Sequence, residues 1–406
     1  MRVETGVPPV PEPGQVFDLA DPAAYAERSA HGAWLCLRSA EPVRLDRTQD
    51  GVPYWSFFSY AECETILKDT GTFSSVSGTI LDSVGRPDPA GGRTMVLSDP
   101  PDHTPIRAVT LRHLGAKAVR REEHRIRAGV SRLVAAFVEG EHDVMPVLRR
   151  LPMAAIGPLL GLPERDWEAM TLHSIGCVAP EDPEFARGDT ETTLLREHSR
   201  LIRLIDDVVR APEACGFATD LRALTIGDGP AGRREAVLNL YSVLVGGNTT
   251  TPHVAAHLML RLAEEPGLVH ELRRSPGLVS GLVEESVRWT TPTHSLVRRV
   301  NTGAELGGVR LEAGDWVAAW VASANRDESV FDEPYEFRPH RAAGPHLGFG
   351  RGAHYCAGAW AARLLLRAFV EELLARGLDF RCVAEPRHLT STVVNGVSTL
   401  QMRFFR

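Results

Sequence analysis

The stretch that most constrains this chain is 346–358, with the sequence HLGFGRGAHYCAG. Its glycines permit backbone conformations and close approaches that a side chain would block. They precede a single cysteine, Cys356, at the start of a long helical run. A helix N-terminus carries unpaired N–H groups and a positive potential, and both stabilise a thiolate. Because thiolate is one of the few protein groups that bind haem iron axially, the stretch predicts a sulfur ligand to iron.

Two other interpretations of this loop stay open at the level of its residues. A cysteine at a helix start is most often a small buried hydrophobe. A glycine-rich turn before a helix can also cradle a phosphate, although no strand–helix–strand unit surrounds the loop, as a dinucleotide site would require. The choice among these interpretations therefore depends on whether the rest of the chain also indicates an iron ligand.

Composition and charge exclude several classes of protein. The 406 residues include 24% charged side chains, carry a formal net charge of −7 and contain no basic run typical of nucleic-acid binding. Six cysteines occur without a C-x-x-C pair, which favours free thiols in a reducing compartment. No run of about 18 apolar residues predicts a membrane span, and residues 1–20 predict an irregular arm without a signal peptide's apolar core. We expect a cytoplasmic protein that binds neither nucleic acid nor a membrane.

The periodicity predicts one domain over residues 1–406, mainly α-helical with a smaller, segregated β part. The longest helical pattern, 233–263, is interrupted by Gly246-Gly247 and by Pro252. The other expected elements are a hairpin at 42–45 and 52–58, helices at 22–30, 59–69, 276–290 and 357–376, a succession of helices from 116 to 211, and strands at 297–300, 309–311, 316–320 and after 377.

The motif F-G-x-G-x-H-x-C-x-G runs through the cysteine loop without a gap. Its fixed positions are Phe349, Gly350, Gly352, His354, Cys356 and Gly358. This stretch resembles the haem-binding loop of the cytochrome P450 family, and the resemblance extends over essentially the whole chain. It implies the P450 fold, a haem b cofactor with Cys356 as the axial iron ligand, and a soluble, bacterial-type monooxygenase. Phe349, Gly350 and Gly358 are then expected to contact the haem.

Further positions match the family. The resemblance implies that Glu285 and Arg288, which stand i, i+3 on one expected helix, form a buried network with Arg341 that braces the haem loop. It also implies cationic or N–H partners for the two haem carboxylates. The expected partners are His103, Arg107, Arg298 and His354, with Arg299 as the fallback if the strand register is off by one.

The stretch 246–251, GGNTTT, resembles the family's oxygen-binding groove, A/G-G-x-D/E-T-T. Pro252 has no N–H, so the carbonyl of Asn248 loses its helical donor. The resemblance gives Thr250 the role of orienting dioxygen and water. Thr249 and Asn248 are the other catalytic candidates.

The groove lacks the acid of the family's pattern. Thr249 stands in its place, and no carboxylate occurs from 236 to 263. A threonine binds water but is not a useful general acid. Three explanations stay open: a water chain held by Thr249 and Thr250, a proton donor on the substrate, or a reaction without ordinary oxygen scission. His253 and His257 lie i, i+4 on the same helix, a pattern more often incidental than metal-binding.

Substrate contacts can be placed only by region. The loop 77–93, the helix near 244–247, the stretch 291–297 and the tail near 392–395 fall where family members line the pocket. Pocket walls combine apolar groups with a few polar anchors. The pocket candidates are Leu244, Gly246, Gly247, Thr293, His294, Ser295, Val297 and Val394. The polar run around His294 suggests an oxygenated substrate of secondary-metabolite type.

The leading hypothesis is a haem-thiolate monooxygenase that hydroxylates or otherwise oxidises a small organic molecule with O2 and external electrons. The chain has no flavin or iron–sulfur motif, so a ferredoxin and its ferredoxin reductase are the expected donors. Their expected docking site is a basic patch of Arg107, Arg112, Arg351 and Arg363. One alternative, prompted by Thr249, is an atypical haem-thiolate reaction: peroxide-driven oxidation, coupling or cyclisation. A second is a non-catalytic haem sensor.

Overall fold

The computed structural model describes residues 17–27, 29–211, 215–226, 229–341 and 344–406. Most of the arm expected at 1–20 therefore lies outside the described residues, and 17–20 contain no helix or strand. Among the described residues, no helix combines the length and the apolar character needed to cross a bilayer.

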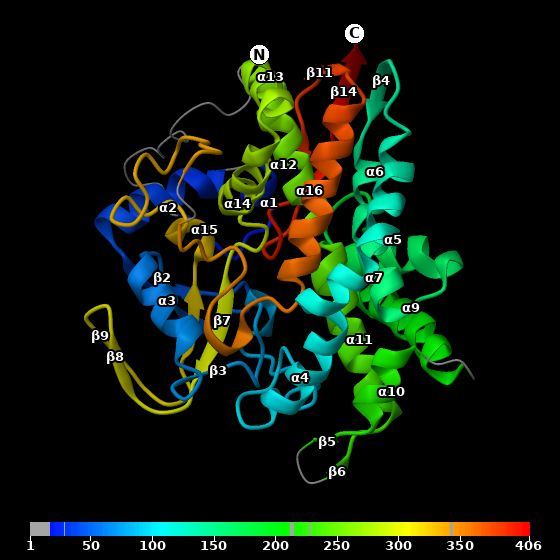
Figure 1. Ribbon diagram of the computed structural model, residues 1–406. Coiled ribbons are helices and arrows are strands. Elements are labelled where there is room, and N and C mark those ends of the chain that lie inside the picture. Colours follow the sequence, from blue (N-terminus) through cyan, green and yellow to red (C-terminus); the bar gives the residue numbers. More distant parts are fainter. Residues whose placement is uncertain (1–16, 28, 212–214, 227–228, 342–343) are drawn as a thin grey trace.

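Helices make up most of the structure (Figure 1). Up to residue 211 they are α1 Ala23–Ala26, α2 Ser29–Ala40, α3 Tyr60–Lys68, α4 His103–Leu114, α5 Ala116–Val134, α6 Met145–Leu148, α7 Leu151–Leu160, α8 Trp167–Gly176 and α9 Thr190–Arg210. The later helices are α10 Gly216–Arg222, α11 Arg233–Asn248, α12 Thr251–Glu264, α13 Pro266–Arg274, α14 Val279–Thr290, α15 Val321–Ala324 and α16 Ala359–Ala375. The expected mainly helical class is confirmed.

The strands form small separate sheets. The largest has the order β1-β2-β10-β7-β3, built from β1 Val43–Arg47, β2 Pro53–Phe57, β10 Trp316–Ala319, β7 Leu296–Val300 and β3 Phe73–Ser74. A second sheet combines β11 Asp379–Cys382, β14 Gln401–Phe405 and β4 Gly140–Asp143, and hairpins pair β5 Thr225–Ile226 with β6 Gly229–Pro230, β8 Ala304–Leu306 with β9 Val309–Leu311, and β12 Arg387–His388 with β13 Val397–Thr399. The β part is thus minor and segregated, as expected.

Several elements were not predicted from the sequence, and α2 and β4 are two of them. Helix α2 follows the short helix expected near 22–30, and β4 occupies a stretch where only a break between helices was expected. The sequence of β4, GEHD, has no apolar alternation. It is a strand because it pairs along β14, with Met402 opposite His142, and such a tertiary pairing leaves no local signal.

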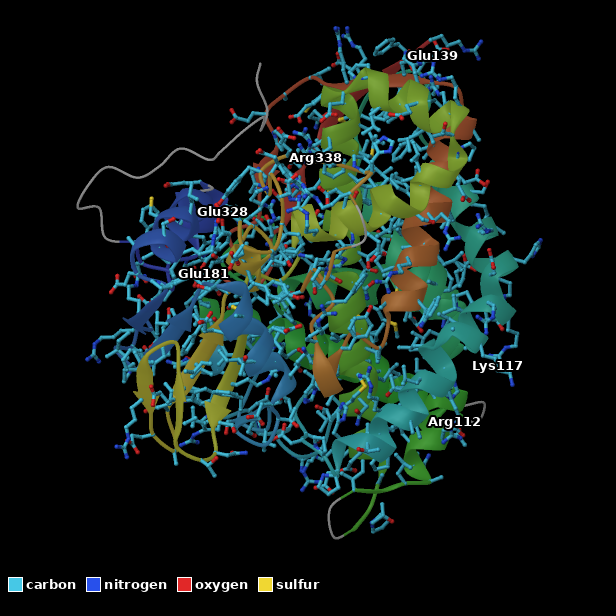
Figure 2. All side chains as sticks on the ribbon, turned by 60° about the vertical axis from the view of Figure 1, so that its left-hand side comes forward. Arg112, Lys117, Glu139, Glu181, Glu328 and Arg338 are labelled. Carbon is cyan, nitrogen blue, oxygen red and sulfur yellow. The ribbon has the colours of Figure 1, made fainter. Side chains whose placement is uncertain are left out.

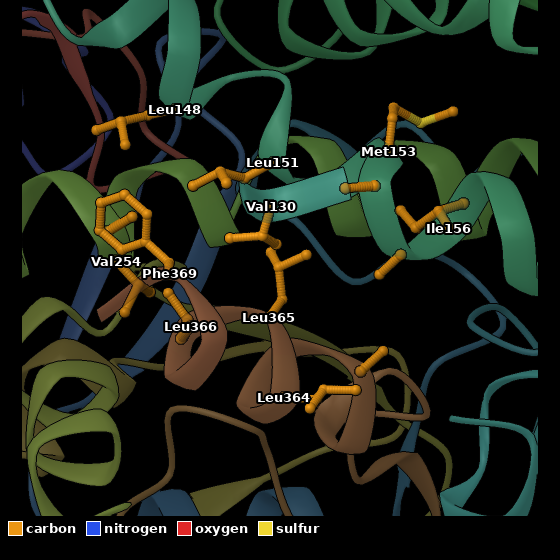
Figure 3. Close-up of a cluster of buried hydrophobic side chains, with 14 of the residues drawn as sticks. Val130, Leu148, Leu151, Met153, Ile156, Val254, Leu364, Leu365, Leu366 and Phe369 are labelled. Atoms are coloured by element: carbon orange, nitrogen blue, oxygen red, sulfur yellow. The ribbon is translucent and has the colours of Figure 1, made fainter. Parts of the chain in front are cut away.

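Charged side chains such as Arg112, Glu139 and Glu181 project from the surface (Figure 2), whereas the helices meet around an apolar core. Figure 3 shows part of this core, in which Val130 from α5, Leu151 from α7, Val254 from α12, and Leu365 and Phe369 from α16 come together. Because α7, α12 and α16 contribute to one core, their relative positions are set by packing. This core holds the elements that surround the functional cavity.

The interrupted helical pattern is a broken helix in the structure. Helix α11 ends at Asn248, α12 begins at Thr251, and Pro252 lies in the first turn of α12. Proline is tolerated in a first turn because the N–H groups there have no intrahelical acceptor. Of the residues around the break, Gly246, Gly247, Thr250 and Thr251 line one cavity.

A second turn directs β7 towards the same region. Helix α14 ends at Thr290, and the next residue, Thr291, has a φ of +40°, in the left-handed region that β-branched residues seldom adopt. The Thr291 hydroxyl donates to the carbonyl of Arg288 (2.7 Å) and accepts from Asn325 Nδ2 (2.7 Å). These two hydrogen bonds hold the turn that leads into β7.

Candidate active site

A cavity of about 340 Å³ lies between the broken helix and the cysteine loop. Most of its wall is apolar. Its lining residues are Leu67, Thr79, Met95, Val96, Arg107, Leu114, Pro152, Ala155, Ile156, Ser242, Val243, Gly246, Gly247, Thr250, Thr251, Val254, Val287, Pro292, Thr293, Leu296, Arg298, Val321, residues 347–351, residues 354–358, Ala361, Ala362, Leu365 and Leu366. No carboxylate lines the cavity among the residues that the structure describes.

Cys356 belongs to the wall of this cavity, and its exposed surface faces the interior space. Its backbone N–H donates to the carbonyl of Phe349 (2.8 Å), which closes the loop on itself. Gly350 and Gly352, with φ of +69° and +66°, make the turns, and a Cβ on Gly352 would lie 2.9 Å from Lys68 Cα. Those two positions therefore require glycine.

Two opposing influences act on the Cys356 thiol. Burial raises its pKa, while the backbone N–H groups of Gly358 and Ala359 and the guanidinium groups of Arg107 and Arg363 lower it, with a net rise. The surroundings therefore contain donors and cations that favour a thiolate. Binding of a metal ion would supply the remaining stabilisation.

Arg298 supplies a buried positive charge to the cavity. Its side chain is 2% exposed, Nη1 donates to the carbonyl of Val297 (2.7 Å), and Nε has no partner. Burial lowers its pKa from the usual guanidinium range to about 10, so the group stays charged at neutral pH. The neighbouring Arg299 projects from the other face of β7, where its guanidinium lies 5.6 Å from the ring centre of Trp316. Arg298 therefore lines the cavity, and the fallback residue Arg299 lies outside its wall.

Two histidine rings pack against each other near Arg298, at an interplanar angle of 51°. The rings of His103 and His354 are 4.5 Å apart, and His354 Nε2 lies 3.2 Å from Ser75 Oγ and 3.8 Å from Asp99 Oδ1. His354 lines the cavity, whereas His103 stands behind it with a buried, unpartnered Nε2. Burial, helped by His354 and Arg107, lowers the pKa of His103 to about 4. His103 can therefore position His354 but does not itself reach the cavity.

The three residues expected to form a bracing network, Glu285, Arg288 and Arg341, lie together in the structure. Glu285 accepts from Arg288 through both carboxylate oxygens (2.8 and 2.7 Å), and Arg341 Nε lies 3.4 Å from the same carboxylate. The remaining donors of Arg288 bind the carbonyls of Asn325, Pro334 and Glu336. With Glu285 3% and Arg288 1% exposed, the pair is buried and fully hydrogen-bonded.

The three catalytic candidates point in different directions. Thr250 lines the cavity, with its hydroxyl donating to the carbonyl of Gly246 (2.7 Å). Thr249 is 3% exposed and donates to the carbonyl of Val245 (2.8 Å) outside the cavity. Asn248 is fully buried towards α7 and α8, where its amide lies 3.4 Å from Ser174 Oγ. A catalytic role therefore fits Thr250 and does not fit Thr249 or Asn248.

The pocket candidates are also divided. Gly246, Gly247 and Thr293 line the cavity, whereas Leu244, His294, Ser295, Val297 and Val394 do not. Adjacent residues in extended chain face opposite sides, so Thr293 faces the cavity while His294 packs 4.3 Å from the Tyr25 ring. The sequence reading missed Ile156 and its neighbours in α7 because nothing local marks them as cavity residues.

The family model for cytochrome P450 matches residues 277–385. The chain is 35% identical to a putative cytochrome P450 126 of Mycobacterium tuberculosis, over 92% of this chain and 94% of that protein. It is 30% identical to linalool 8-monooxygenase of Pseudomonas putida, over 95% and 98%. A solved structure of a P450 EryK mutant with erythromycin B superposes with a TM-score of 0.80 at 28% identity, covering 93% and 97% of the two chains. The chain belongs to the cytochrome P450 family.

This P450 is accordingly a haem-dependent, oxygen-incorporating oxidoreductase that uses O2, a small-molecule substrate and redox partners. The residues present fit a haem. The cavity offers a cysteine sulfur on its wall, the cation of Arg298 with an unpartnered Nε, and Arg107 and His354 beside it. A Cβ built on Gly246 would meet nothing within 4 Å, so the wall near the helix break leaves open space.

The four arginines expected to form a basic patch are mostly engaged elsewhere in this P450. Arg363 binds Glu284 through two hydrogen bonds (2.6 and 2.9 Å), and Arg351 Nε binds Glu64 (3.2 Å). Arg107 donates to a backbone carbonyl (2.7 Å). Of the four, Arg112 has the most exposed side chain, at 61%. The expected patch is therefore largely neutralised by internal pairing.

Proposed function

We propose that this P450 hydroxylates or otherwise oxidises a neutral, largely apolar small molecule in the cytoplasm. The observation that carries the proposal is that Cys356, Arg298 and Thr250 line the same cavity. Haem b is the cofactor, and a ferredoxin with its ferredoxin reductase supplies the electrons. The absence of a flavin or iron–sulfur motif in the sequence supports an external donor.

Cys356 holds the iron through its sulfur, and Arg107, Arg298 and His354 bind the haem carboxylates. A buried cation with an unpartnered N–H, as in Arg298, is costly unless an anion satisfies it. His103 positions His354 by packing its tilted ring against the ring of His354. Phe349, Gly350 and Gly358 belong to the same seat and allow the flat ring to approach the loop.

When bound, the haem supplies O2 activation, in which two electrons and two protons are consumed, one oxygen atom enters the substrate and the other leaves as water. Thr250 lies on the cavity wall with a hydroxyl that donates to the Gly246 carbonyl (2.7 Å). The Gly246 carbonyl lies one helical turn before Thr250. When the Thr250 hydroxyl rotates away from this carbonyl, it can donate its proton in a hydrogen bond to a water or a substrate oxygen in the cavity. The apolar wall excludes bulk water from the reaction.

The source of protons supports a second candidate function. No described carboxylate lines the cavity, and the Thr249 hydroxyl is bonded to the Val245 carbonyl outside it. Protons must then travel through water held by Thr250 and Thr251 or come from a substrate hydroxyl. A peroxide-driven, coupling or cyclising reaction would avoid part of this requirement. The monooxygenase names of relatives favour oxygen insertion over this candidate and over a non-catalytic sensor.

The wall itself supports the substrate class. Met95, Val96, Ile156 and Val243 present apolar surface, and the polar groups on the substrate side are hydroxyls, such as that of Thr293. A site without a charge on this side favours a neutral ligand with one hydrogen-bonding group. One relative is named for linalool, which is in keeping with that class.

Two measurements test the proposal. The carbon-monoxide difference spectrum of the reduced protein should show the red-shifted thiolate band, and Cys356→Ala should abolish it. Wild-type behaviour of Cys356→Ala would refute the assignment of the iron ligand. Turnover under ¹⁸O2 should then add one labelled oxygen atom to the product. A product that gains no oxygen would favour coupling or cyclisation, and unlabelled oxygen with added peroxide would favour the peroxide route.

A further inference from the structure

Helix α11 carries a buried asparagine in an otherwise apolar stretch, 236–241, with the sequence AVLNLY. Asn239 is 2% exposed and lies within the helix, two turns before Gly246 at the helix break. Asparagine is a poor helix former because its side chain competes with the backbone for hydrogen bonds. A buried amide without partners is also costly. The contacts of Asn239 explain why it stands there.

The Asn239 amide holds part of the loop that precedes α4. Its Oδ1 accepts from the backbone N–H of Met95 (2.9 Å). Its Nδ2 donates to the carbonyl of Arg93 (3.0 Å) and to the carbonyl of Glu235 on its own helix (2.9 Å). One N–H and two carbonyls fit only this orientation of the amide, because a carboxamide accepts through its oxygen and donates through its nitrogen. Two of the three hydrogen bonds therefore go to the loop.

The segment that Asn239 holds is closed on itself. The N–H of Gly92 donates to the carbonyl of Leu97 (2.6 Å), and the N–H of Leu97 donates to the hydroxyl of Thr94 (3.1 Å). Gly92 has a φ of +73°, which glycine adopts without strain. Residues 92–97 therefore form one hydrogen-bonded turn, and the position of this turn depends on what binds it from outside.

A second anchor holds the other end of the turn. Asp99 accepts from the hydroxyl of Ser74 (2.5 Å) and from the N–H of Ser75 (3.1 Å), and so ties the chain to the end of β3. Met95 and Val96 lie between the anchor on α11 and the anchor on β3, and both line the cavity. The apolar wall that these two residues form is therefore fixed relative to α11.

An ion pair also links the loop to α11, but it is exposed. Arg93 Nη1 lies 2.7 Å from Glu235 Oε1, and 47% of the Arg93 side chain is exposed. Exposed ion pairs contribute little to stability, whereas a buried amide that loses its partners is costly. The amide is therefore the stronger link, and the ion pair offers a control on the same two elements.

We infer that Asn239 is a positioning residue that holds Met95 and Val96 against the ligand and thereby sets how this P450 discriminates ligands by length. Ser242 and Val243 follow Asn239 by one turn of α11 and also line the cavity. The amide therefore fixes the distance between the wall on the loop and the wall on α11. An apolar ligand gains affinity with each added methylene only where a wall stays in contact with it. The inference deepens the proposed function and rests on it.

The probes for the test are 1-alkylimidazoles with chains of one to eight carbon atoms, added to the haem-loaded full chain. The imidazole nitrogen binds iron, and the Kd is read from the spectral shift that a nitrogen ligand causes. In the unaltered protein, each methylene that packs against the wall should lower the Kd by about fourfold. In Asn239→Ala the decrease should be about twofold or less, because Met95 and Val96 are no longer held in one position.

A double-mutant cycle separates positioning from a general weakening of the protein. Combining Met95→Ala with Val96→Ala should also reduce the dependence of Kd on chain length. Adding Asn239→Ala to that variant should change the dependence little further, because the amide acts through these two side chains. Additive effects, or an unchanged dependence in Asn239→Ala alone, would overturn the inference.

Further variants keep the possible failures apart. Arg93→Gln removes only the exposed ion pair and should keep the wild-type dependence on chain length; a loss equal to that in Asn239→Ala would overturn the role of the amide. If Asn239→Ala does not retain haem, Asn239→Asp replaces it. That variant keeps the acceptor for the Met95 N–H and loses the donor to the Arg93 carbonyl, so an intermediate dependence is expected and a wild-type dependence would overturn the inference. Absence of any nitrogen-ligand shift in the unaltered protein, even with 1-methylimidazole, would instead refute the haem site of the proposed function.

Discussion

The two walls of the cavity are built by different means. On the cysteine side, the buried charges other than Arg298 have partners within the chain: Arg288 uses its donors on Glu285 and three carbonyls, and Glu284 accepts from Arg363. On the side of the broken helix, no described carboxylate faces the cavity, and Thr250 bonds only its own helix. The first wall tolerates little change because each charge depends on another. The side of the broken helix has hydroxyl groups that can exchange one hydrogen-bond partner for another. Such an exchange is needed where waters and substrates bind in turn.

The strongest test of this contrast removes the charge at the centre of the bracing network. Glu285→Gln leaves Arg288 and Arg341 without a carboxylate in a buried place, and breaking such a pair costs about 3–5 kcal/mol. We expect loss of most of the haem content and a large fall in the urea midpoint. The matched control is Arg338→Gln, whose exposed side chain binds Asp332 and Glu336 at the surface. Equal effects of the two substitutions would show that burial is not what makes the network important.

The next largest effect is expected at the buried cation. Arg298→Gln removes the charge that the haem carboxylate needs, and a hydrogen bond to a charged group is worth about 1.5–3 kcal/mol. Haem transfer to excess apomyoglobin should therefore be roughly 10 to 100 times faster. Arg299→Gln, on the opposite face of β7, should transfer haem at the wild-type rate. Faster loss from Arg299→Gln instead would mean that the strand register assigned to the site is wrong.

These two walls were also unequally predictable. The cysteine loop, the ion network and the strand β9 follow from local patterns, because a glycine turn or an i, i+3 pair is visible within a few residues. The directions of Asn248 and His294 do not follow from local patterns. Both residues belong to segments that do line the cavity, yet their side chains face α8 and Tyr25. Which of two adjacent residues faces a cavity depends on packing against distant elements.

The distant elements themselves leave little trace in the sequence. Ile156 reaches the cavity because α7 packs on α11, where a Cβ on Gly247 would lie 2.4 Å from Ile156 Cδ1. From the sequence alone, Gly247 is recognised only as part of a groove motif, and its contact with Ile156 is not apparent. In the same way, Asn239 is recognised only as a polar residue in a helical pattern, and its hydrogen bonds to the loop are not apparent. Helix contacts therefore decide what the motif residues do.

Thr293 and His294 are adjacent in the sequence, yet the first faces the cavity and the second faces the core. Substituting each of them tests this difference. Burial lowers the pKa of His294 from 6.5 to about 3, so the folded protein holds it neutral. As the pH falls below 6.5 the unfolded chain takes up a proton first, and stability is lost down to about pH 3. At pH 5 this loss amounts to about 2 kcal/mol. His294→Phe, which keeps an aromatic ring beside Tyr25, should therefore lose less stability than the wild type between pH 7 and pH 5.

The measurement is the urea midpoint at the two pH values, with Thr293→Val as the neighbouring control. Thr293→Val should keep the wild-type pH dependence and instead weaken the spin-state shift caused by ligands with a hydroxyl group, because Thr293 lines the cavity. If His294→Phe altered ligand binding and Thr293→Val did not, then His294 would line the cavity and Thr293 would belong to the core, the reverse of the assignment made here.

The smallest expected effect concerns the hydroxyls of the broken helix. Thr250→Ala removes the hydroxyl that faces the cavity, and losing about one hydrogen bond to the reacting atoms lowers product formed per electron consumed by roughly tenfold. Thr249→Ala removes a hydroxyl bonded to the Val245 carbonyl outside the cavity and should leave this ratio unchanged. The measurement compares product with hydrogen peroxide released under the same electron supply. If Thr249→Ala lowered the product formed per electron as much as Thr250→Ala, protons would have to pass through both threonines. The residues on the side of the broken helix would then depend on one another as much as those on the cysteine side do.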